Sequence, residues 1–158
     1  MAMETKRKYL VISEEYKSLA FEYSEYCEGH LSNHSSCLII IKILDQVGSI
    51  TIQGLPGNPG TDFYVWEREL ALKDAKEMIK FCLPGMIQKT RYFIKSGHFT
   101  IEVDEFKGAN EGLVMAEIES DQNIEYHNKP AWLGMEVTRD KKFNHENLIS
   151  KPFKNWKK

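Results

Sequence analysis

The sequence predicts an α+β protein whose main element is an antiparallel β-barrel. Three observations support this: seven segments alternate polar and apolar residues with a period of two, two stretches show helical spacing, and the connections are short. Strands joined mainly by hairpins are typical of antiparallel barrels rather than of parallel α/β folds. The chain of 158 residues has the length of one domain, and we expect residues 1–158 to form it.

The segments with the alternation of β-strands are residues 3–11, 37–44, 48–53, 63–70, 88–95, 98–106 and 112–120. Gly, Pro and Asn dominate residues 54–60, so we interpret this stretch as a long hairpin connection and not as a domain boundary. Seven or eight strands of this kind are enough to close a barrel.

Two stretches have the apolar spacing of amphipathic helices. Ser13 is a suitable N-cap for the first, which should end at Gly29. Its apolar stripe consists of Tyr16, Leu19, Ala20, Tyr23 and Cys27. The second helix is expected from about Lys73 to Cys82, where Leu-Pro-Gly at 83–85 stops it, and a short third turn is expected at 145–149.

Composition and charge exclude several classes of protein. The net charge is −2, from 21 basic and 23 acidic residues, whereas a protein that binds nucleic acid by neutralising phosphates usually has a basic excess. The longest apolar run, at 38–41, is too short to cross a bilayer, and the first residues lack the apolar stretch of a signal peptide. Cys27, Cys37 and Cys82 show no CxxC spacing, so we expect free thiols in a cytoplasmic protein with no nucleic-acid or membrane partner. The histidines show no metal-ligand spacing and are expected at the surface or in loops; they are His30, His34, His98, His127 and His145.

One face of most predicted strands is ionic and carries both signs. Residues spaced by two share a face of a strand. The charged sets so spaced are Glu4, Lys6 and Lys8, Glu67 and Glu69, Lys89 and Arg91, Glu102 and Asp104, and Glu117 and Glu119. The alternate positions are mostly apolar or aromatic, as at Trp66, Ile101 and Val114.

Two arrangements fit this alternation. In the first, the apolar faces pack inward and the charges form a solvated exterior, which is the usual pattern of antiparallel sheets. In the second, the charges line a lumen, where carboxylates could bind divalent cations and Lys and Arg could bind phosphate oxygens. Water, a metal or a polyanion would then have to share the lumen, because burying many charges is otherwise costly. The period alone leaves both arrangements open.

Several motifs resemble the CYTH family, the triphosphate tunnel metalloenzymes. Residues 4–11 (ETKRKYLV) are similar to the N-terminal EIERKFLV of that family. The other motifs are ITIQG at 50–54, KTRY at 89–92, EVDEF at 102–106, GLVMAEIE at 112–119, WLGMEVT at 132–138 and PFKNW at 152–156. Together they span essentially the whole chain in family order, and the most similar subgroup is that of short, stand-alone bacterial proteins.

The resemblance implies an eight-stranded antiparallel β-barrel that encloses an ion-lined tunnel, with helices packed outside. It also implies Mg²⁺- or Mn²⁺-dependent chemistry on a small anionic substrate. Activities in the family include hydrolysis of inorganic tripolyphosphate, thiamine triphosphatase, RNA triphosphatase and the adenylyl cyclase reaction. Short bacterial members are mainly associated with tripolyphosphate hydrolysis, and a homodimer is compatible with the resemblance.

Site residues carry over from the resemblance position by position. The phosphate-binding positions are Lys8, Lys42, Lys89 and Arg91, and the metal-binding positions are Glu4, Glu117 and Glu119. Of these, Glu4, Lys8 and Arg91 are expected to be catalytic. Lys6, Glu67, Glu69, Glu102 and Asp104 are expected to complete the lining of the tunnel. Water attack on a terminal phosphorus needs positioning and charge stabilisation more than a covalent nucleophile.

Five positions in the first half of the chain depart from the family pattern. Lys6 replaces the second carboxylate of ExExK, Ile40 and Lys42 replace the arginines of RxR, Gln53 replaces the lysine of TIKG, and Val65 replaces the first carboxylate of ExExE. A charged hydrogen bond contributes ~1.5–3 kcal/mol, so losing two donors should weaken polyphosphate binding by ~100-fold or more. Lys6 both removes a metal ligand and adds a positive charge beside the cation.

Two functions from different classes therefore remain open. The first is a diverged metal-dependent phosphohydrolase of reduced activity that acts on inorganic tripolyphosphate or a related phosphate. The second is a weak or inactive relative that keeps the tunnel as a phosphate- or anion-binding module. An adenylyl cyclase is a third interpretation, although nothing in the sequence marks an adenine pocket.

Overall fold

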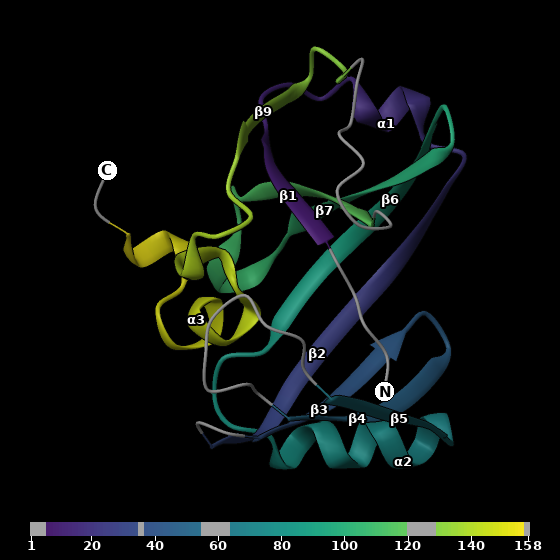
Figure 1. Ribbon diagram of the computed structural model, residues 1–158. Coiled ribbons are helices and arrows are strands. Elements are labelled where there is room, and N and C mark those ends of the chain that lie inside the picture. The colour runs from purple at the N-terminus through teal and green to yellow at the C-terminus, as the bar shows by residue number, and fades with distance from the viewer. Residues whose placement is uncertain (1–5, 35–36, 55–63, 120–128, 157–158) are drawn as a thin grey trace.

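The computed structural model describes residues 6–34, 37–54, 64–119 and 129–156, and in these ranges the chain forms one strongly curved antiparallel sheet with few helices (Figure 1). The strands are β1 (Lys6–Val11), β2 (Glu22–His34), β3 (Cys37–Leu44), β4 (Val47–Gly54), β5 (Tyr64–Leu70), β6 (Ile87–Ser96), β7 (Phe99–Phe106), β8 (Val114–Glu119) and β9 (Leu133–Glu136). The α-helices are α1 (Tyr16–Leu19), α2 (Leu72–Met78) and α3 (His145–Ser150). Short 3-10 turns lie at Ile79–Phe81, Gly108–Asn110, Lys141–Phe143 and Phe153–Asn155.

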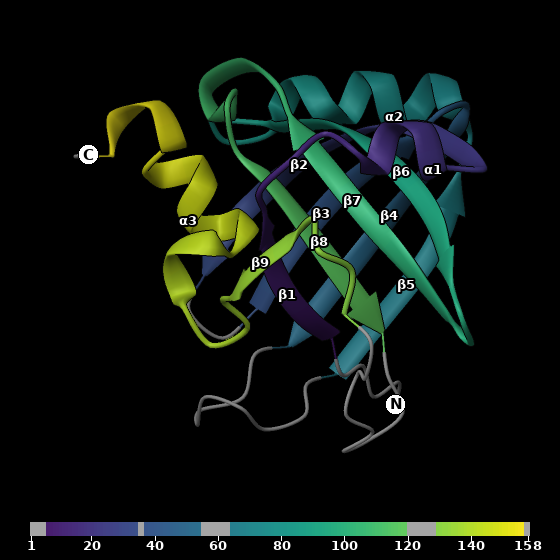
Figure 2. The same cartoon turned by 90° about the horizontal axis from the view of Figure 1, so that it is seen from above.

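The nine strands follow the order β5-β4-β3-β2-β6-β7-β8-β1-β9. In Figure 1 the long strands β2 and β6 rise from a lower layer of β3, β4 and β5 towards α1 at the top of the molecule. Figure 2 shows β6 and β7 crossing over β3, β4 and β5, so the sheet curls back over itself. The α+β class and the antiparallel sheet are thus confirmed. The expected count of eight strands and the closure of the barrel by hydrogen bonds are not confirmed. Among the described residues the sheet has nine strands, and hydrogen bonds do not join the edge strands β5 and β9.

The prediction of a long first helix, from Ser13 to Gly29, is wrong. Only Tyr16–Leu19 is helical, and Glu22–His34 forms β2, which pairs with β3 on one side and β6 on the other. The apolar stripe at 16–27 fits a helix, but Ser24, Tyr26, Glu28 and His30 are all buried with a period of two. Strand pairing on both sides satisfies the backbone of β2, so tertiary context overrides the local pattern. The other helices are confirmed, since α2 continues into the turn at Ile79–Phe81 and α3 begins at His145.

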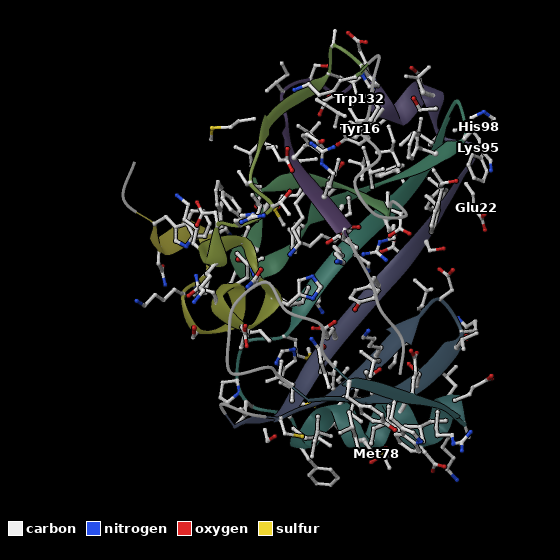
Figure 3. The ribbon with its side chains drawn as sticks, viewed as in Figure 1. Tyr16, Glu22, Met78, Lys95, His98 and Trp132 are labelled. Atoms are coloured by element: carbon white, nitrogen blue, oxygen red, sulfur yellow. The ribbon has the colours of Figure 1, made fainter. Side chains whose placement is uncertain are left out.

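The two faces of the sheet have different environments. We call the face that carries Glu28, Lys89 and Asp104 the inner face, and the face that carries Ile41 and Ile101 the outer face. A cluster of buried apolar residues lies on the outer face, where Tyr16 of α1 packs on Trp132 with ring centroids 6.2 Å apart (Figure 3). Its members include Tyr9, Tyr16, Ile94, Ile101, Val103, Ala116, Ile118 and Trp132.

Helix α2 also covers the outer face, at the β3–β4 end of the sheet (Figure 1). A Cβ atom at Gly48 would lie 2.5 Å from the Cβ of Ala75, so the close approach of α2 to β4 requires glycine there. The expectation of helices packed outside is thus confirmed for α1 and α2. No helix in the described part of the chain is long and apolar enough to span a membrane.

The third helix is different, because it closes one end of the inner face. Leu148 of α3 is fully buried in a second apolar cluster, together with residues from the strands and from the C-terminal segment. These are Tyr26, Ile87, Phe106, Leu113, Met115, Val137 and Phe143. The helix thereby brings His145, its first residue, next to the ionic positions of β2 and β6.

Candidate functional site

The register of the central strands gathers the predicted ionic residues on the inner face. Directly paired positions share a face of an antiparallel sheet. The relevant pairs are Tyr26 with Lys89, Arg91 with Asp104, Glu102 with Glu117, and Glu117 with Lys8. Lys89 and Asp104 are each 1% exposed and Glu117 is 8% exposed. Of the two arrangements that the sequence left open, the structure therefore has the one with the charges inside.

Asp104 is the centre of this cluster. Its Oδ2 accepts a hydrogen bond from Lys89 Nζ at 2.8 Å, and Arg91 donates from Nε to Oδ1 at 2.8 Å and from Nη2 to Oδ2 at 3.1 Å. Burial opposes ionisation, but the two adjacent cations outweigh it and hold the pKa of Asp104 well below its usual range. Asp104 is therefore an anion that fixes two cations in place.

Arg91 also reaches a second carboxylate, with Nη1 3.0 Å from Glu102 Oε2. The Glu102 side chain is more exposed than that of Asp104, and desolvation nevertheless raises the pKa of its carboxyl while Arg91 opposes the shift. The negative charge of Glu117, which lies opposite Glu102 across the β7–β8 ladder, raises that pKa further. Two carboxylates thus face one another beside a guanidinium.

The first strand brings its lysines to the same cluster. Lys6 Nζ lies 3.7 Å from Glu117 Oε2, and Lys8 Nζ donates to Asn144 Oδ1 at 3.2 Å. Although burial opposes it, the surrounding cations lower the pKa of Glu117. Lys6 therefore stands next to a predicted metal ligand. Glu4 lies outside the described residues, as does the side chain of Glu119, whose backbone pairs with Lys6.

Lys42 lies on the inner face opposite Glu28, whose pKa it helps to lower. The predicted carboxylates Glu67 and Glu69 are exposed on β5, at the edge of the sheet, opposite Thr51 and Ser49. They form no ion pair with another described residue in the structure. The structure thus gathers Lys6, Lys8, Lys42, Lys89, Arg91, Glu102, Asp104 and Glu117 on the inner face over β1, β3 and β6–β8. Glu67 and Glu69 lie on the same face by register, but at the β5 edge.

Three of the five positions that depart from the family pattern, Ile40, Gln53 and Val65, gather at the opposite end of the sheet. Ile40 pairs with Thr51, and Gln53 pairs with Val65, so these positions of β3, β4 and β5 supply no cation. The same face of β5 carries the carboxylates of Glu67 and Glu69. Ile40 is 4% exposed, and the Thr51 hydroxyl is buried without a hydrogen-bond partner among the described residues. The cationic half of the inner face therefore consists of β1 and β6, with Lys42 of β3 at its border, and the neighbouring β7 and β8 contribute carboxylates.

Four site residues were not predicted, and they form one hydrogen-bonded group. Glu28 Oε2 lies 2.8 Å from His30 Nε2 and 2.9 Å from His145 Nδ1, and Glu28 Oε1 accepts a hydrogen bond from the Tyr26 hydroxyl. Glu28 and His30 are 2% and 3% exposed, so the expectation that His30 and His145 lie at the surface or in loops is wrong for both. The sequence gives no clear signal for them, because the residues buried with a period of two in this strand include the polar Ser24, Glu28 and His30 and so show no apolar alternation.

The carboxylates of the inner face have the donor chemistry of a Mg²⁺ or Mn²⁺ site, since both ions prefer hard oxygen ligands. Both oxygens of Asp104 and both oxygens of Glu28 already accept hydrogen bonds. Glu102 and Glu117, opposed across the β7–β8 ladder, are less completely paired than Asp104 and Glu28. Within the described residues no group of three or more His, Cys, Asp or Glu side chains is arranged to hold a metal. Glu102 and Glu117 therefore fit as part of the ligand set of a Mg²⁺ or Mn²⁺ ion, and other carboxylates would have to complete that set.

Comparison with known proteins gives one relative along the whole chain and several similar folds. No family model matches the sequence. An inorganic triphosphatase of Acetivibrio thermocellus is 35% identical over 158 residues, which is 99% of this chain and 99% of that protein. The crystal structure of an inorganic triphosphatase has a TM-score of 0.71 and 22% identity, over 94% of this chain and 95% of that chain. An adenylyl cyclase-like protein from Hippeastrum, described as having a dominant triphosphatase activity, has a TM-score of 0.58 and 12% identity, over 76% and 80% of the two chains.

Proposed function

Because the chain belongs to the CYTH family of triphosphate tunnel proteins, we propose that it is a metal-dependent phosphohydrolase that acts on inorganic tripolyphosphate or a closely related triphosphate. The observation that carries this proposal is the cationic half of the inner face, where Arg91 and two lysines of β1 lie beside buried carboxylates. Such a surface attracts a small polyanion and offers the oxygen ligands that a divalent cation needs.

Arg91 and Lys8 are the residues we assign to the phosphate oxygens. The Arg91 side chain is 15% exposed and held by Asp104 and Glu102, so its guanidinium is oriented before substrate arrives. Lys8 lies on the neighbouring part of the inner face, and Lys42 borders it on β3. These donors would stabilise the charge that builds up on the terminal phosphoryl group during water attack.

Members of the family generally depend on a divalent cation, and Mg²⁺ or Mn²⁺ is the cofactor we propose. Glu117, together with Glu4 and Glu119, would hold the ion, and Glu102 would complete the carboxylate side of the site. When bound, the ion neutralises part of the substrate charge and polarises a phosphoryl oxygen. We assign no covalent nucleophile, since the three cysteines are unpaired thiols and burial raises the pKa of Cys27 and Cys82.

We propose reduced turnover compared with members that keep every tunnel charge. The reason is that Ile40 and Gln53 supply no cationic donor to the β3–β4 half of the inner face. The loss of two charged hydrogen bonds predicts a tripolyphosphate affinity lower by ~100-fold or more. A cytoplasmic location would fit a substrate of this kind.

The second candidate function is an anion-binding protein without turnover. It is favoured by the contact between Lys6 and Glu117, in which an ammonium occupies a position next to a predicted metal ligand. In that case Lys6 would balance the carboxylate charge in place of a divalent ion.

Release of phosphate from tripolyphosphate, pyrophosphate, ATP and thiamine triphosphate distinguishes the two functions. With Mg²⁺ or Mn²⁺, tripolyphosphate should be hydrolysed fastest, and Glu117→Gln should reduce the rate by ~100-fold or more, as does loss of a group that acts in the transition state. Glu77→Gln, at an exposed position of α2, is the matched control and should leave the rate unchanged. Calorimetric binding of tripolyphosphate without any release would support the anion-binding function, and release that survives chelation would contradict the metal-dependent mechanism.

A further inference from the structure

Lys89 is the most deeply buried of the predicted phosphate-binding residues. Its side chain is 0% exposed, whereas that of Arg91, two residues further along β6, is 15% exposed. Lys89 Nζ lies 4.5 Å from the centroid of the Tyr26 ring and 5.3 Å from that of the Phe106 ring. Aromatic faces, and not open space, therefore surround the ammonium where it is not hydrogen-bonded.

The hydrogen bonds of Lys89 determine the protonation of its neighbour. An ammonium group donates three hydrogen bonds and accepts none. Lys89 Nζ donates to Asp104 Oδ2 at 2.8 Å and lies 3.0 Å from His145 Nε2, so this ring nitrogen must be the acceptor. The proton of the neutral imidazole then lies on Nδ1, which donates to Glu28 Oε2 at 2.9 Å.

The same chain of hydrogen bonds continues at both ends. Glu28 is fixed by Tyr26 and His30 as well as by His145. Asp104, at the other end, holds the guanidinium of Arg91 by two hydrogen bonds. The order is thus Glu28, His145, Lys89, Asp104 and Arg91, and every step is a direct contact of 3.1 Å or less.

We propose that Glu28, His145 and Lys89 are positioning residues that hold Asp104, and through it the Arg91 guanidinium, in the orientation that binds a substrate phosphate. The inference rests on the proposed function and changes the role of one residue in it: Lys89 acts through Arg91 and does not contact the substrate. Arg91 is the terminal member of the network, and its side chain is 15% exposed, whereas those of Glu28, Lys89 and Asp104 are 0–3% exposed. The His145 side chain, at the far end of Lys89, is 24% exposed.

The physical reason is that Asp104 can orient Arg91 only if its own carboxylate is held by a group other than Arg91. The two hydrogen bonds from Arg91 fix the guanidinium and the carboxylate relative to each other, and Lys89, which donates to Oδ2, anchors the pair to the buried part of the inner face. Lys89 in turn has a flexible stem with several rotatable bonds, and His145 supplies the second acceptor that fixes its ammonium. Because the imidazole is neutral, it orients Lys89 without cancelling positive charge near the phosphate site.

A double-mutant cycle measured by calorimetric titration of tripolyphosphate in metal-free buffer tests the proposal. Lys89→Met and Arg91→Met should each weaken binding by ~10-fold or more, and Lys89→Met in the Arg91→Met background should weaken it no further than ~2-fold, because residues that act as one unit are non-additive. Additive losses would show that Lys89 binds the substrate directly and would overturn the proposal.

Variants of His145 provide the second measurement, because α3 is at the end of the sheet and Lys89→Met could affect folding. His145→Gln keeps a side-chain acceptor and should stay within ~3-fold of wild-type affinity, whereas His145→Leu should weaken binding by ~10-fold. Equal affinities of wild type and His145→Leu, in proteins with the same thermal midpoint, would also overturn the proposal.

Nitrogen NMR of the histidine rings separates failure of this inference from failure of the proposed function. The network requires His145 to carry its proton on Nδ1 and not on Nε2. An Nε2-protonated ring would reject the network itself, whatever the protein binds. The expected tautomer combined with no tripolyphosphate binding by the wild type would instead reject the proposed function, and with it the phosphate-binding role of Arg91.

Discussion

Replacing Asp104 by asparagine should destabilise the protein by ~3–5 kcal/mol, the usual cost of removing one partner from a buried ion pair. Asp104 is 1% exposed and accepts three hydrogen bonds from two cations, so the variant leaves Lys89 and Arg91 buried with less compensation. For a chain of this length such a loss corresponds to a decrease of ~6–20 °C in the thermal midpoint.

The assay is urea unfolding of wild type and variant, followed by tryptophan fluorescence. A matched control is Glu136→Gln, since Glu136 is bound by Arg7 at 2.8 Å in an ion pair whose side chains are 30% and 38% exposed. That exposed pair should contribute less than ~1 kcal/mol. Equal losses in the two variants, or a loss below ~1 kcal/mol for Asp104→Asn, would refute the conclusion that burial makes the Asp104 contacts strong.

The same residue predicts how stability depends on acid. The pKa of Asp104 in the folded protein lies well below its value of ~3.9 in an unfolded chain, so its contribution is complete above about pH 4–5. It is lost as the pH falls further, because the unfolded chain binds a proton that the folded chain does not. Asp104→Asn should therefore show a smaller loss of unfolding free energy than wild type between about pH 4 and pH 2.

Three further predictions concern other parts of the molecule. Gly48→Ala should destabilise the protein by ~1–3 kcal/mol in urea unfolding, because its Cβ would lie 2.5 Å from that of Ala75 in α2. Lys6→Glu should tighten Mn²⁺ binding in calorimetric titration, since it removes the ammonium 3.7 Å from Glu117 and adds a carboxylate. Unfolding free energy should fall between about pH 7 and pH 5, because burial holds the pKa of His145 below its ordinary value and the unfolded chain is protonated first; His145→Gln should reduce this slope.

Each of these has an outcome that would contradict it. Gly54→Ala, whose Cβ would meet its nearest neighbour at an ordinary 3.6 Å, is the control for Gly48→Ala, and equal losses would show that the α2 contact is not the cause. Weaker Mn²⁺ binding by a folded Lys6→Glu variant would mean that the ion binds away from Glu117. An unchanged slope in His145→Gln would mean that another group takes up the proton.

The family resemblance and the period-two charges of the sequence were sufficient to predict the antiparallel sheet and the gathering of its charged residues on one face. Lys8, Lys89, Arg91, Asp104 and Glu117 were placed on one face from spacing and motif alone, because alternation along a strand is a local property that survives in any fold. The choice between a charged interior and a charged exterior came from the motifs and not from the alternation, since the period is the same in both.

Tertiary structure alone decided the remainder. β2 has a locally helical pattern, and only its pairing with β3 and β6 makes it a strand. Its residues Tyr26 and Glu28 consequently meet His145, which lies 117 positions from Glu28 in the sequence. The periodicity of the sequence does not predict a contact between such distant segments, because the contact depends on how α3 packs over the end of the sheet. The sequence thus determined which charges share a strand face, and the packing of β2 and α3 decided which of them are buried, which are accessible and which partners hold them.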